Sequence, residues 1–267
     1  MPPIVTLTTD FGLSDPFVGV MKGVMLSINP SITLVDITHE INPQDVRQAV
    51  YVIGSAFEYF PKGTIHLCVV DPGVGSERKA VAFEAGGQYF IGPDNGVFTE
   101  VLRRTKVSAS HEITNPSVIL PNQSATFHGR DVFAPAAAHL AKGTPLNSFG
   151  PPAENLMSMD LPWEMRPAPD LVVGEVIYID HFGNAITNIT RSLVERAARE
   201  MDGAQVRIGF ENGAIDGVLS NYSEADEEMS ACAVFGSWDT LEIFVRNGDA
   251  AFIHGLEVGD EVQIRFS

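Results

Sequence analysis

Residues 64–78 read TIHLCVVDPGVGSER, and this stretch indicates both the fold class and the first candidate site. Residues 64–70 form an apolar run typical of a buried strand. Asp71, a Pro-Gly turn and then Arg78 follow directly. In α/β proteins, ligands bind beyond the carboxyl ends of the strands. We therefore expect a buried strand that carries an acid and an arginine into a ligand site.

The residues around this stretch alternate between strand and helix patterns. Asp15-Pro16 resembles a helix start, and Ala85-Gly86-Gly87 predicts a hairpin turn. This order of elements predicts a layered α/β domain with a mostly parallel sheet. The expected strands are 4–9, 32–36, 64–70, 80–84 and 89–92, and the expected helices begin near residues 15, 42, 96 and 131.

The character of the chain changes after residue 145. Six of its 17 prolines fall between residues 145 and 169, which indicates a linker or an extended connection. Short strand-like segments and one helix at 192–201 follow, and they favour a small β-barrel or sandwich. We therefore divide the chain into an α/β domain at 1–150, a linker at 151–170 and a β-barrel domain at 171–267.

Composition limits the partners and the compartment. The formal charge of −17 argues against a nucleic-acid partner, because phosphate binding needs a basic face. No apolar run approaches the length needed to span a membrane, and no basic segment precedes an apolar one at the start. Cys68 and Cys232 are too few for a disulfide framework, and Cys68 is expected in the core. We expect a cytoplasmic protein that acts on a small molecule.

Two further motifs in the α/β domain can contribute to a site. Asp10-Phe11-Gly12 follows the first expected strand, where an acid can accept hydrogen bonds from ribose hydroxyls. His128-Gly129 lies at an expected helix start, and with Asp71 and Arg78 it would form an acid–base set with a fixed positive charge. Such polar neighbours in the sequence are lacking at His39, His66, His111, His139 and His254, and His66 is expected to be structural.

The second half of the chain contains one motif of similar quality. Asp180-His181-Phe182-Gly183-Asn184 offers an acid, an amide and an aromatic ring suited to holding a base. A plain hairpin turn explains the same residues equally well. Arg246-Asn247 indicates only a turn between late strands. No metal-binding spacing is present, so neither a metal nor another cofactor is expected.

The motifs at Asp10, Asp71 with Arg78, His128 and Asp180 occur in the order seen in the S-adenosyl-L-methionine hydroxide adenosyltransferases, which the chain resembles over essentially its whole length. These are relatives of fluorinating and chlorinating enzymes. The resemblance implies a Rossmann-like N-terminal domain, a C-terminal β-barrel and a homotrimer with sites between subunits. It also implies displacement of methionine from C5′ of S-adenosylmethionine by water or hydroxide, giving adenosine and L-methionine.

The resemblance also assigns residues to roles. Asp71, Arg78 and His128 would be catalytic, with the base left open between Asp71 and His128. Gly129 would leave room for the water. Substrate would contact the residues Asp10, Phe11, Gly129, Asp180, Phe182, Asn184, Ser237, Arg246 and Asn247.

Halogenating relatives are expected to carry Tyr at the position of Asp71, Ser at the position of Gly129 and an insertion near Gly86. All three positions place this chain on the hydroxide branch. It also differs from the halogenases at Gln44, where they have tryptophan. A halide-using synthase and a non-catalytic adenosine or S-adenosylmethionine binding protein remain the alternative functions.

Overall fold

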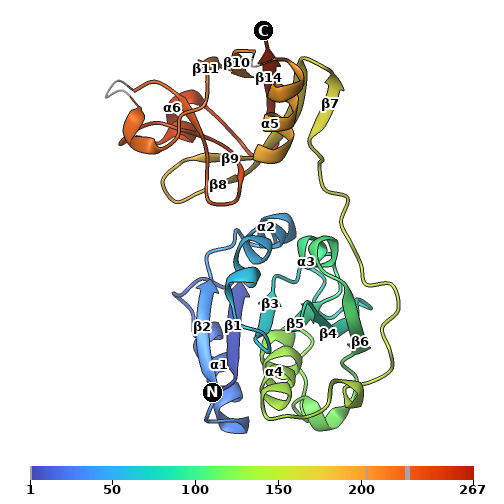
Figure 1. Ribbon diagram of the computed structural model, residues 1–267. Helices are drawn as coiled ribbons and strands as arrows, with labels where there is room; N and C mark the ends of the chain where they lie inside the picture. Colours follow the sequence, from blue (N-terminus) through green and yellow to red (C-terminus); the bar gives the residue numbers. More distant parts are fainter. Residues whose placement is uncertain (1, 203, 226–228) are drawn as a thin grey trace. The chain divides into compact units, whose positions relative to one another are not determined.

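The computed structural model describes residues 2–202, 204–225 and 229–267 (Figure 1). The chain divides into two compact units, Met1–Met159 and Asp160–Ser267. No helix in these described ranges combines the length and apolar character needed to cross a lipid bilayer.

The first unit is built on a mixed six-stranded sheet with the order β2-β1-β3-β5-β4-β6. Strands β1, β2, β3 and β5 are parallel, and β4 and β6 run antiparallel to their neighbours. The predicted hairpin is confirmed, because Gly86 and Gly87 take positive φ angles of 61° and 79° between β4 and β5. The strands are β1 (Ile4–Thr9), β2 (Thr33–Thr38), β3 (Ile65–Val69), β4 (Ala80–Ala85), β5 (Gln88–Pro93) and β6 (Val107–Glu112).

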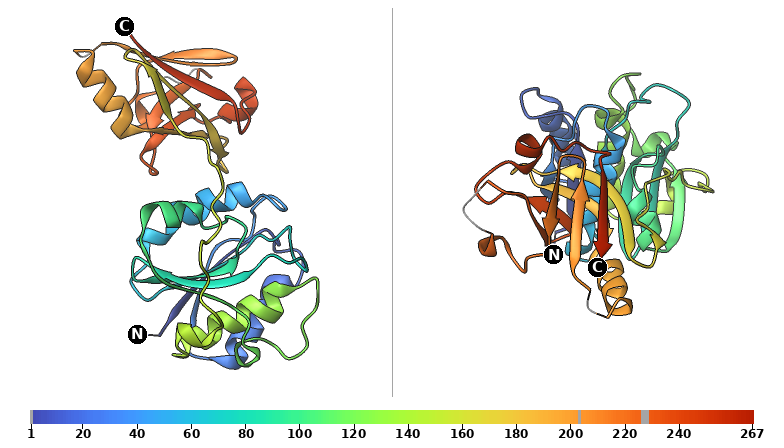
Figure 2. Two further views of the ribbon diagram at one scale, coloured as in Figure 1. Left: turned by 90° about the vertical axis from the view of Figure 1, so that its right-hand side faces the viewer. Right: turned by 90° about the horizontal axis from the view of Figure 1, so that it is seen from above.

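Helices cover both faces of this sheet (Figures 1 and 2). Helices α1 (Phe17–Ile28) and α4 (Ala134–Ala141) pack together on one face. Helices α2 (Val46–Ala56) and α3 (Thr99–Arg104) pack together on the other. The main core joins β1 and β3 to α1 and α4 through buried side chains that include Leu7, Leu67, Met21, Met25 and Phe133.

The strand order creates a ligand-binding position at the carboxyl end of β1. Since β1 lies between β2 and β3, the chain passes from β1 to β2 on one side and then to β3 on the other side of β1. Open α/β sheets bind ligands at such a reversal of strand order. Thr9 and Val69 are neighbours in the β1–β3 register, so the loops that begin at Asp10 and Val70 emerge side by side.

The second unit is an antiparallel, nearly closed barrel-like sheet with the order β11-β10-β14-β8-β9-β13-β12, and β7 also pairs with β8. Helix α5 (Arg191–Glu200) is capped by the side chain of Thr190, and the short α6 (Ala250–His254) is capped by Asp249. The strands are β7 (Met165–Ala168), β8 (Leu171–Ile179), β9 (Ala185–Thr190), β10 (Val206–Phe210), β11 (Gly213–Asp216), β12 (Cys232–Phe235), β13 (Thr240–Phe244) and β14 (Glu261–Phe266).

The predicted fold class is confirmed in both units. Cys68 and His66 are buried as expected, with exposures of 0% and 1%. The proline-rich segment is not uniform, because residues 165–168 form β7. Its earlier part bonds to the first unit, where the Met157 and Met159 N–H groups each donate at 2.8 Å to side chains of that unit.

Candidate active site

The loop after β3 orders Asp71 and Arg78 through successive turns. The Val74 N–H donates to the Asp71 carbonyl at 3.2 Å, and the Ser76 N–H donates to the Gly73 carbonyl at 3.0 Å. Gly75 takes a φ of +79°, and a Cβ there would lie 2.5 Å from the Ala125 carbonyl oxygen. Only glycine fits this conformation and this close approach, so Gly75 seats the loop against the segment that precedes His128.

Arg78 joins the acid to the histidine. Its Nε lies 3.0 Å from each carboxylate oxygen of Asp71, and its Nη2 donates to Asp71 Oδ2 as well. The same Nη2 lies 2.7 Å from Nδ1 of His128. The side chains of Arg78 and Asp71 are only 11% and 6% exposed. The structure therefore brings together the three residues that the sequence predicts as an acid–base set.

The arginine contact determines how the His128 ring can be protonated. A guanidinium group has N–H donors and no acceptor, so His128 Nδ1 must accept this hydrogen bond. Neutral His128 then carries its proton on Nε2. Burial lowers the pKa of His128 below its ordinary value, and the nearby Arg78 charge lowers this pKa further. His128 is thus a neutral hydrogen-bond donor at Nε2 near pH 7.

Asp10 is held by backbone groups from the loop after β2. The Gln44 N–H donates to Asp10 Oδ2 at 2.8 Å. Gln44 adopts a positive φ of 68°, which a residue other than glycine rarely takes. Strain of this kind is concentrated at functional sites, and here it directs an N–H group at the acid.

These groups surround a cavity of about 650 Å³ at the carboxyl ends of β1 and β3. Its volume falls in the range of small-molecule sites. Phe11, Phe17 and Phe127 form one aromatic wall, with ring centroids 5.3–5.8 Å apart. The lining residues are Asp10, Phe11, Phe17, Pro43, Gln44, Val69, Asp71, Pro72, Val74, Ser124, Thr126, Phe127, His128, Gly129 and Arg130.

Gly129 lines the cavity and packs closely against the aromatic wall. Its missing Cβ would point at Phe127, Met21 and Phe11, at distances of 3.1–3.3 Å. The absent side chain therefore lets the aromatic wall close on the π-helical turn Gly129–Phe133.

The second unit orders its own predicted motif as a tight turn. Asp180 Oδ1 accepts the N–H groups of Phe182 and Asn184 at 2.8 and 2.9 Å. Asp180 Oδ2 accepts the Asn184 side-chain amide at 2.9 Å. Asp180 therefore orders this turn through three hydrogen bonds. The turn still leaves Phe182 73% exposed, as a ring available for stacking.

The turn at 180–184 packs on the start of α6. The Ala251 N–H donates to the Gly183 carbonyl at 2.9 Å, so residues 180–184 lie beside the loop that contains Arg246 and Asn247. Arg246 Nη1 donates to the Ala225 carbonyl at 2.8 Å, and Asn247 takes a positive φ of 56°. Ser237 lies in the turn between β12 and β13. The predicted residues of this unit therefore lie on three of its turns.

Each half of the chain matches the corresponding family model. Residues 5–150 match the SAM hydroxide adenosyltransferase N-terminal domain, where SAM is S-adenosyl-L-methionine, and residues 174–263 match the C-terminal domain. The chain belongs to this family. Its members therefore share the α/β unit that carries Asp71 and the barrel-like unit that carries Asp180.

Individual proteins agree with this placement in the family. A Thermus thermophilus protein named (R)-S-adenosyl-L-methionine hydrolase is 40% identical, over 99% of this chain and 100% of that protein. A Nocardia brasiliensis fluorinase is 30% identical, over 98% and 97%. The solved structure of an uncharacterized conserved protein from Thermotoga maritima is 38% identical and has a TM-score of 0.91, over 98% and 99%.

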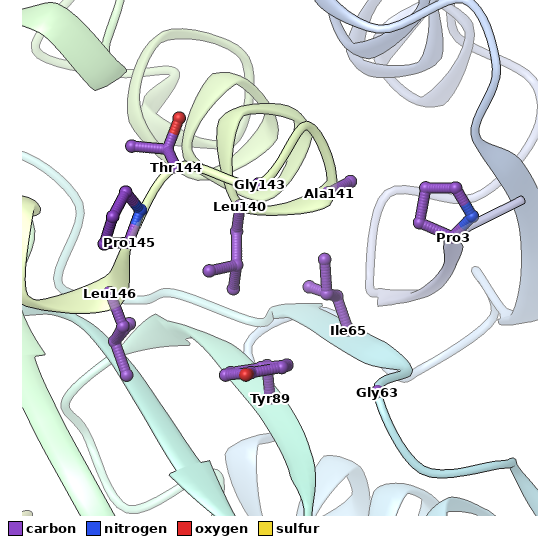
Figure 3. A pocket seen from close by; sticks show the side chains of 10 residues that line it. All are labelled: Pro3, Gly63, Ile65, Tyr89, Leu140, Ala141, Gly143, Thr144, Pro145 and Leu146. Atoms are coloured by element: carbon purple, nitrogen blue, oxygen red, sulfur yellow. The ribbon is translucent and has the colours of Figure 1, made fainter.

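A second, smaller hollow of about 240 Å³ lies at the amino ends of β1 and β3, away from Asp71 (Figure 3). Ile65, Tyr89 and Leu140 line it, and none of its lining residues is charged. Within residues 2–202, 204–225 and 229–267, no group of three or more His, Cys, Asp or Glu side chains is placed to hold a metal ion.

The sequence argument missed the groups that support the Asp10 loop. The Gly12 N–H donates to the His39 carbonyl at 2.8 Å, and the His39 ring contacts Thr9. Sequence neighbours alone therefore gave no sign that His39 supports this loop. Its position just after a predicted strand, parallel to the strand that ends before Asp10, is the signal that could have identified it.

Proposed function

We propose that the protein cleaves S-adenosyl-L-methionine at C5′ with water and forms adenosine and L-methionine. The observation that carries this proposal is the Asp71–Arg78–His128 set, in which Asp71 and His128 line the same cavity as Asp10, and Arg78 bonds to both. Relatives of nearly the same length are named (R)-S-adenosyl-L-methionine hydrolase.

The chemistry of the substrate explains why these residues suffice. The sulfonium group departs as a neutral thioether, so the leaving group needs neither protonation nor a Lewis acid. The difficult part is the nucleophile, because water is weak and hydroxide is scarce near neutral pH. The site must align one water with the C5′–S bond and accept its proton.

The geometry favours Asp71 as the proton acceptor. Arg78 occupies Nδ1 of His128 and leaves a proton on Nε2, so the neutral ring can only donate to the water. The oxygen–carbon bond forms as the C5′–S bond breaks with its electron pair moving to sulfur. The proton of the water passes to Asp71 and then to solvent, while Arg78 holds both partners in place.

The remaining residues would hold the substrate. Asp10 would bind the ribose hydroxyls, while Phe11 and Gly129 would form the wall beside them. Phe182 and Asn184 would hold adenine with Arg246 and Asn247, and Asp180 with Ser237 would face the methionine end. Since Asp180 already accepts three hydrogen bonds, a substrate ammonium would share this carboxylate with the turn.

The proposal includes the assembly and the compartment. We propose a homotrimer in the cytoplasm in which the first unit of one subunit and the second unit of its neighbour build each site. A heterologous contact of this kind closes into a ring. Every subunit would then contribute to two sites.

The decisive experiment follows product formation by the full chain. We expect adenosine and methionine in equal amounts with a chelator present, and one ¹⁸O atom in adenosine when the solvent is H₂¹⁸O. Intact substrate after long incubation, despite binding, would instead support the binding protein. Formation of 5′-chloro-5′-deoxyadenosine in concentrated chloride would support the halide-using synthase.

A further inference from the structure

We propose that Thr9 and His39 are positioning residues that hold the Asp10-Phe11-Gly12 loop in its ribose-binding conformation. The inference rests on the proposed function, because it takes Asp10 as the group that binds ribose. It assigns a role to a buried polar chain that runs behind this loop.

This series of polar side chains begins with Lys22 at the surface and ends at the Asp10 loop. Lys22 Nζ lies 2.6 Å from Asp36 Oδ2, and Asp36 Oδ1 lies 3.0 Å from Nε2 of His39. This second contact is close but falls short of ideal hydrogen-bond alignment. His39 Nδ1 then lies 2.8 Å from Thr9 Oγ1, which accepts the Phe11 N–H at 3.3 Å.

The carboxylate at one end determines the direction of the hydrogen bonds. Asp36 can only accept, so in the neutral ring it favours the proton of His39 on Nε2. Nδ1 is then an acceptor, and Thr9 must donate its hydroxyl proton to it. Both lone pairs of Thr9 Oγ1 therefore remain free for the N–H of Phe11. Partial burial alone would raise the pKa of Asp36, but its contacts with Lys22 and His39 bring this pKa below its ordinary value.

His39 supports the loop a second time through its backbone. Its carbonyl accepts the Gly12 N–H at 2.8 Å. Thr9 is completely buried and His39 is 3% exposed, so neither can touch a ligand in the cavity. Buried groups of this kind act by restricting the conformations of the loop above them.

Thr6 lies on β1, as Thr9 does, and it forms a matched threonine–histidine pair with His66 on β3. This pair lacks these connections. Thr6 Oγ1 lies 2.8 Å from Nδ1 of His66, and both residues are almost fully buried. The His66 ring is surrounded by phenyl rings, with Phe90 stacked on it at 5.0 Å. Thr6 precedes the loop by several residues and is not among the residues that line the cavity. It therefore serves as the control.

The test compares Thr9→Val with Thr6→Val in the full chain. Both substitutions keep the side-chain shape and remove one buried hydroxyl. For Thr9→Val we expect the adenosine Kd by calorimetry and the KM for S-adenosylmethionine to rise about five- to tenfold, because the loop spends less time in its competent conformation. The value of kcat should change less than about twofold, since Asp71 lies on another loop. Thr6→Val should leave all three constants within about twofold.

Equal effects of the two substitutions, or an unchanged adenosine Kd in Thr9→Val, would overturn the inference. If Thr9→Val does not fold, His39→Asn provides the test, because its amide can still contact Thr9 but not Asp36, and it should weaken adenosine binding less than His39→Ala. A wild-type protein that binds adenosine without turning over substrate would refute the proposed function alone. The Thr9 and Thr6 comparison of binding would then still decide the positioning role.

Discussion

At the scale of single residues, Arg78 organises the candidate site. The guanidinium Nε and Nη2 both donate to the Asp71 carboxylate, and Nη2 also donates to the His128 ring. The Phe133 ring lies 5.2 Å below the guanidinium group and restricts its movement. A lysine could not reproduce this planar, two-partner geometry. Arg78 therefore fixes the tautomer of one partner and the orientation of the other.

Replacing the proton acceptor tests its role directly. Asp71→Asn keeps the size of the side chain but cannot accept a proton, so kcat/KM should fall about 10²-fold or more. Glu77→Gln makes the same chemical change on the same loop, at an exposed side chain, and should leave kcat/KM within about twofold. The rate of adenosine formation measures both. A small effect of Asp71→Asn would exclude Asp71 as the base.

The lowered pKa of His128 determines the pH dependence. Burial and Arg78 stabilise the neutral ring, and the neutral ring is the form that accepts the Arg78 N–H. The active form should persist as the pH falls to 6.5, and kcat/KM should decline only below that value. His128→Asn retains an acceptor for Arg78 and should remove this decline. A midpoint above 6.5 in the wild-type pH profile would contradict this account.

The sequence identified residues that directly follow strands better than residues that support them. Asp71 and Asp10 could be predicted because a polar side chain after a buried strand has few structural reasons to be there. Thr9 and His39 could not, because a buried polar residue becomes meaningful only through its partner. The partner of His39 is Asp36, which lies on β2. The sequence does not reveal that β2 pairs with β1, the strand that carries Thr9.

At the scale of elements, two loops form one side of the site by packing on each other. The Gly75 backbone lies close to the Ala125 carbonyl, and the N–H of the neighbouring Ser124 donates to Asp131 Oδ2 at 2.7 Å. The position of Asp71 relative to His128 depends on this contact. A small displacement of reacting groups costs much more in rate than in stability.

Gly75→Ala tests whether the loop contact affects the reaction rate beyond the cost of backbone strain. Alanine at positive φ costs about 1 kcal/mol, and here it would also meet the Ala125 oxygen. We expect a lower thermal midpoint and a loss of kcat/KM of about tenfold or more. Gly217→Ala in the second unit is the control, because Gly217 has a similar positive φ and a Cβ there would meet no atom within 4 Å. It should show the strain by calorimetry and keep full activity; equal losses of activity would refute the role of the loop contact.

The sequence predicted strands with a clear apolar or turn signal more reliably than strands whose stability comes from pairing with a neighbour. Strand β3 and the β4–β5 hairpin could be predicted from a buried apolar run and from two glycines. Strands β6, β7, β9 and β11 were missed. β6 carries polar residues along an edge, and β7 contains a proline beside β8. Such strands form because a neighbour offers hydrogen bonds, and their own sequence patterns do not indicate them.

At the scale of the whole molecule, the candidate residues are divided between two units of one chain. The first unit contributes Asp10, Asp71, Arg78 and His128, and the second contributes Phe182 and Asn184. The acid–base set lies in the first unit, and the exposed Phe182 turn lies in the second. The formal charge of −17 disfavours phosphate ligands but suits a substrate that carries a sulfonium and an ammonium.

Complementation between subunits tests the proposed assembly. Asp71→Asn disables the first unit and Asn184→Ala should disable adenine binding by the second, so each variant alone should be nearly inactive. In a ring with sites between subunits, equal mixing restores sites that combine one intact unit from each variant. Every trimer that contains both variants then has one restored site out of three, so about a third of the wild-type activity should return. Mixed trimers isolated through two different tags provide the sample, and light scattering should give three times the 28.9 kDa chain mass. Mixed trimers that stay inactive would place each complete site within one subunit.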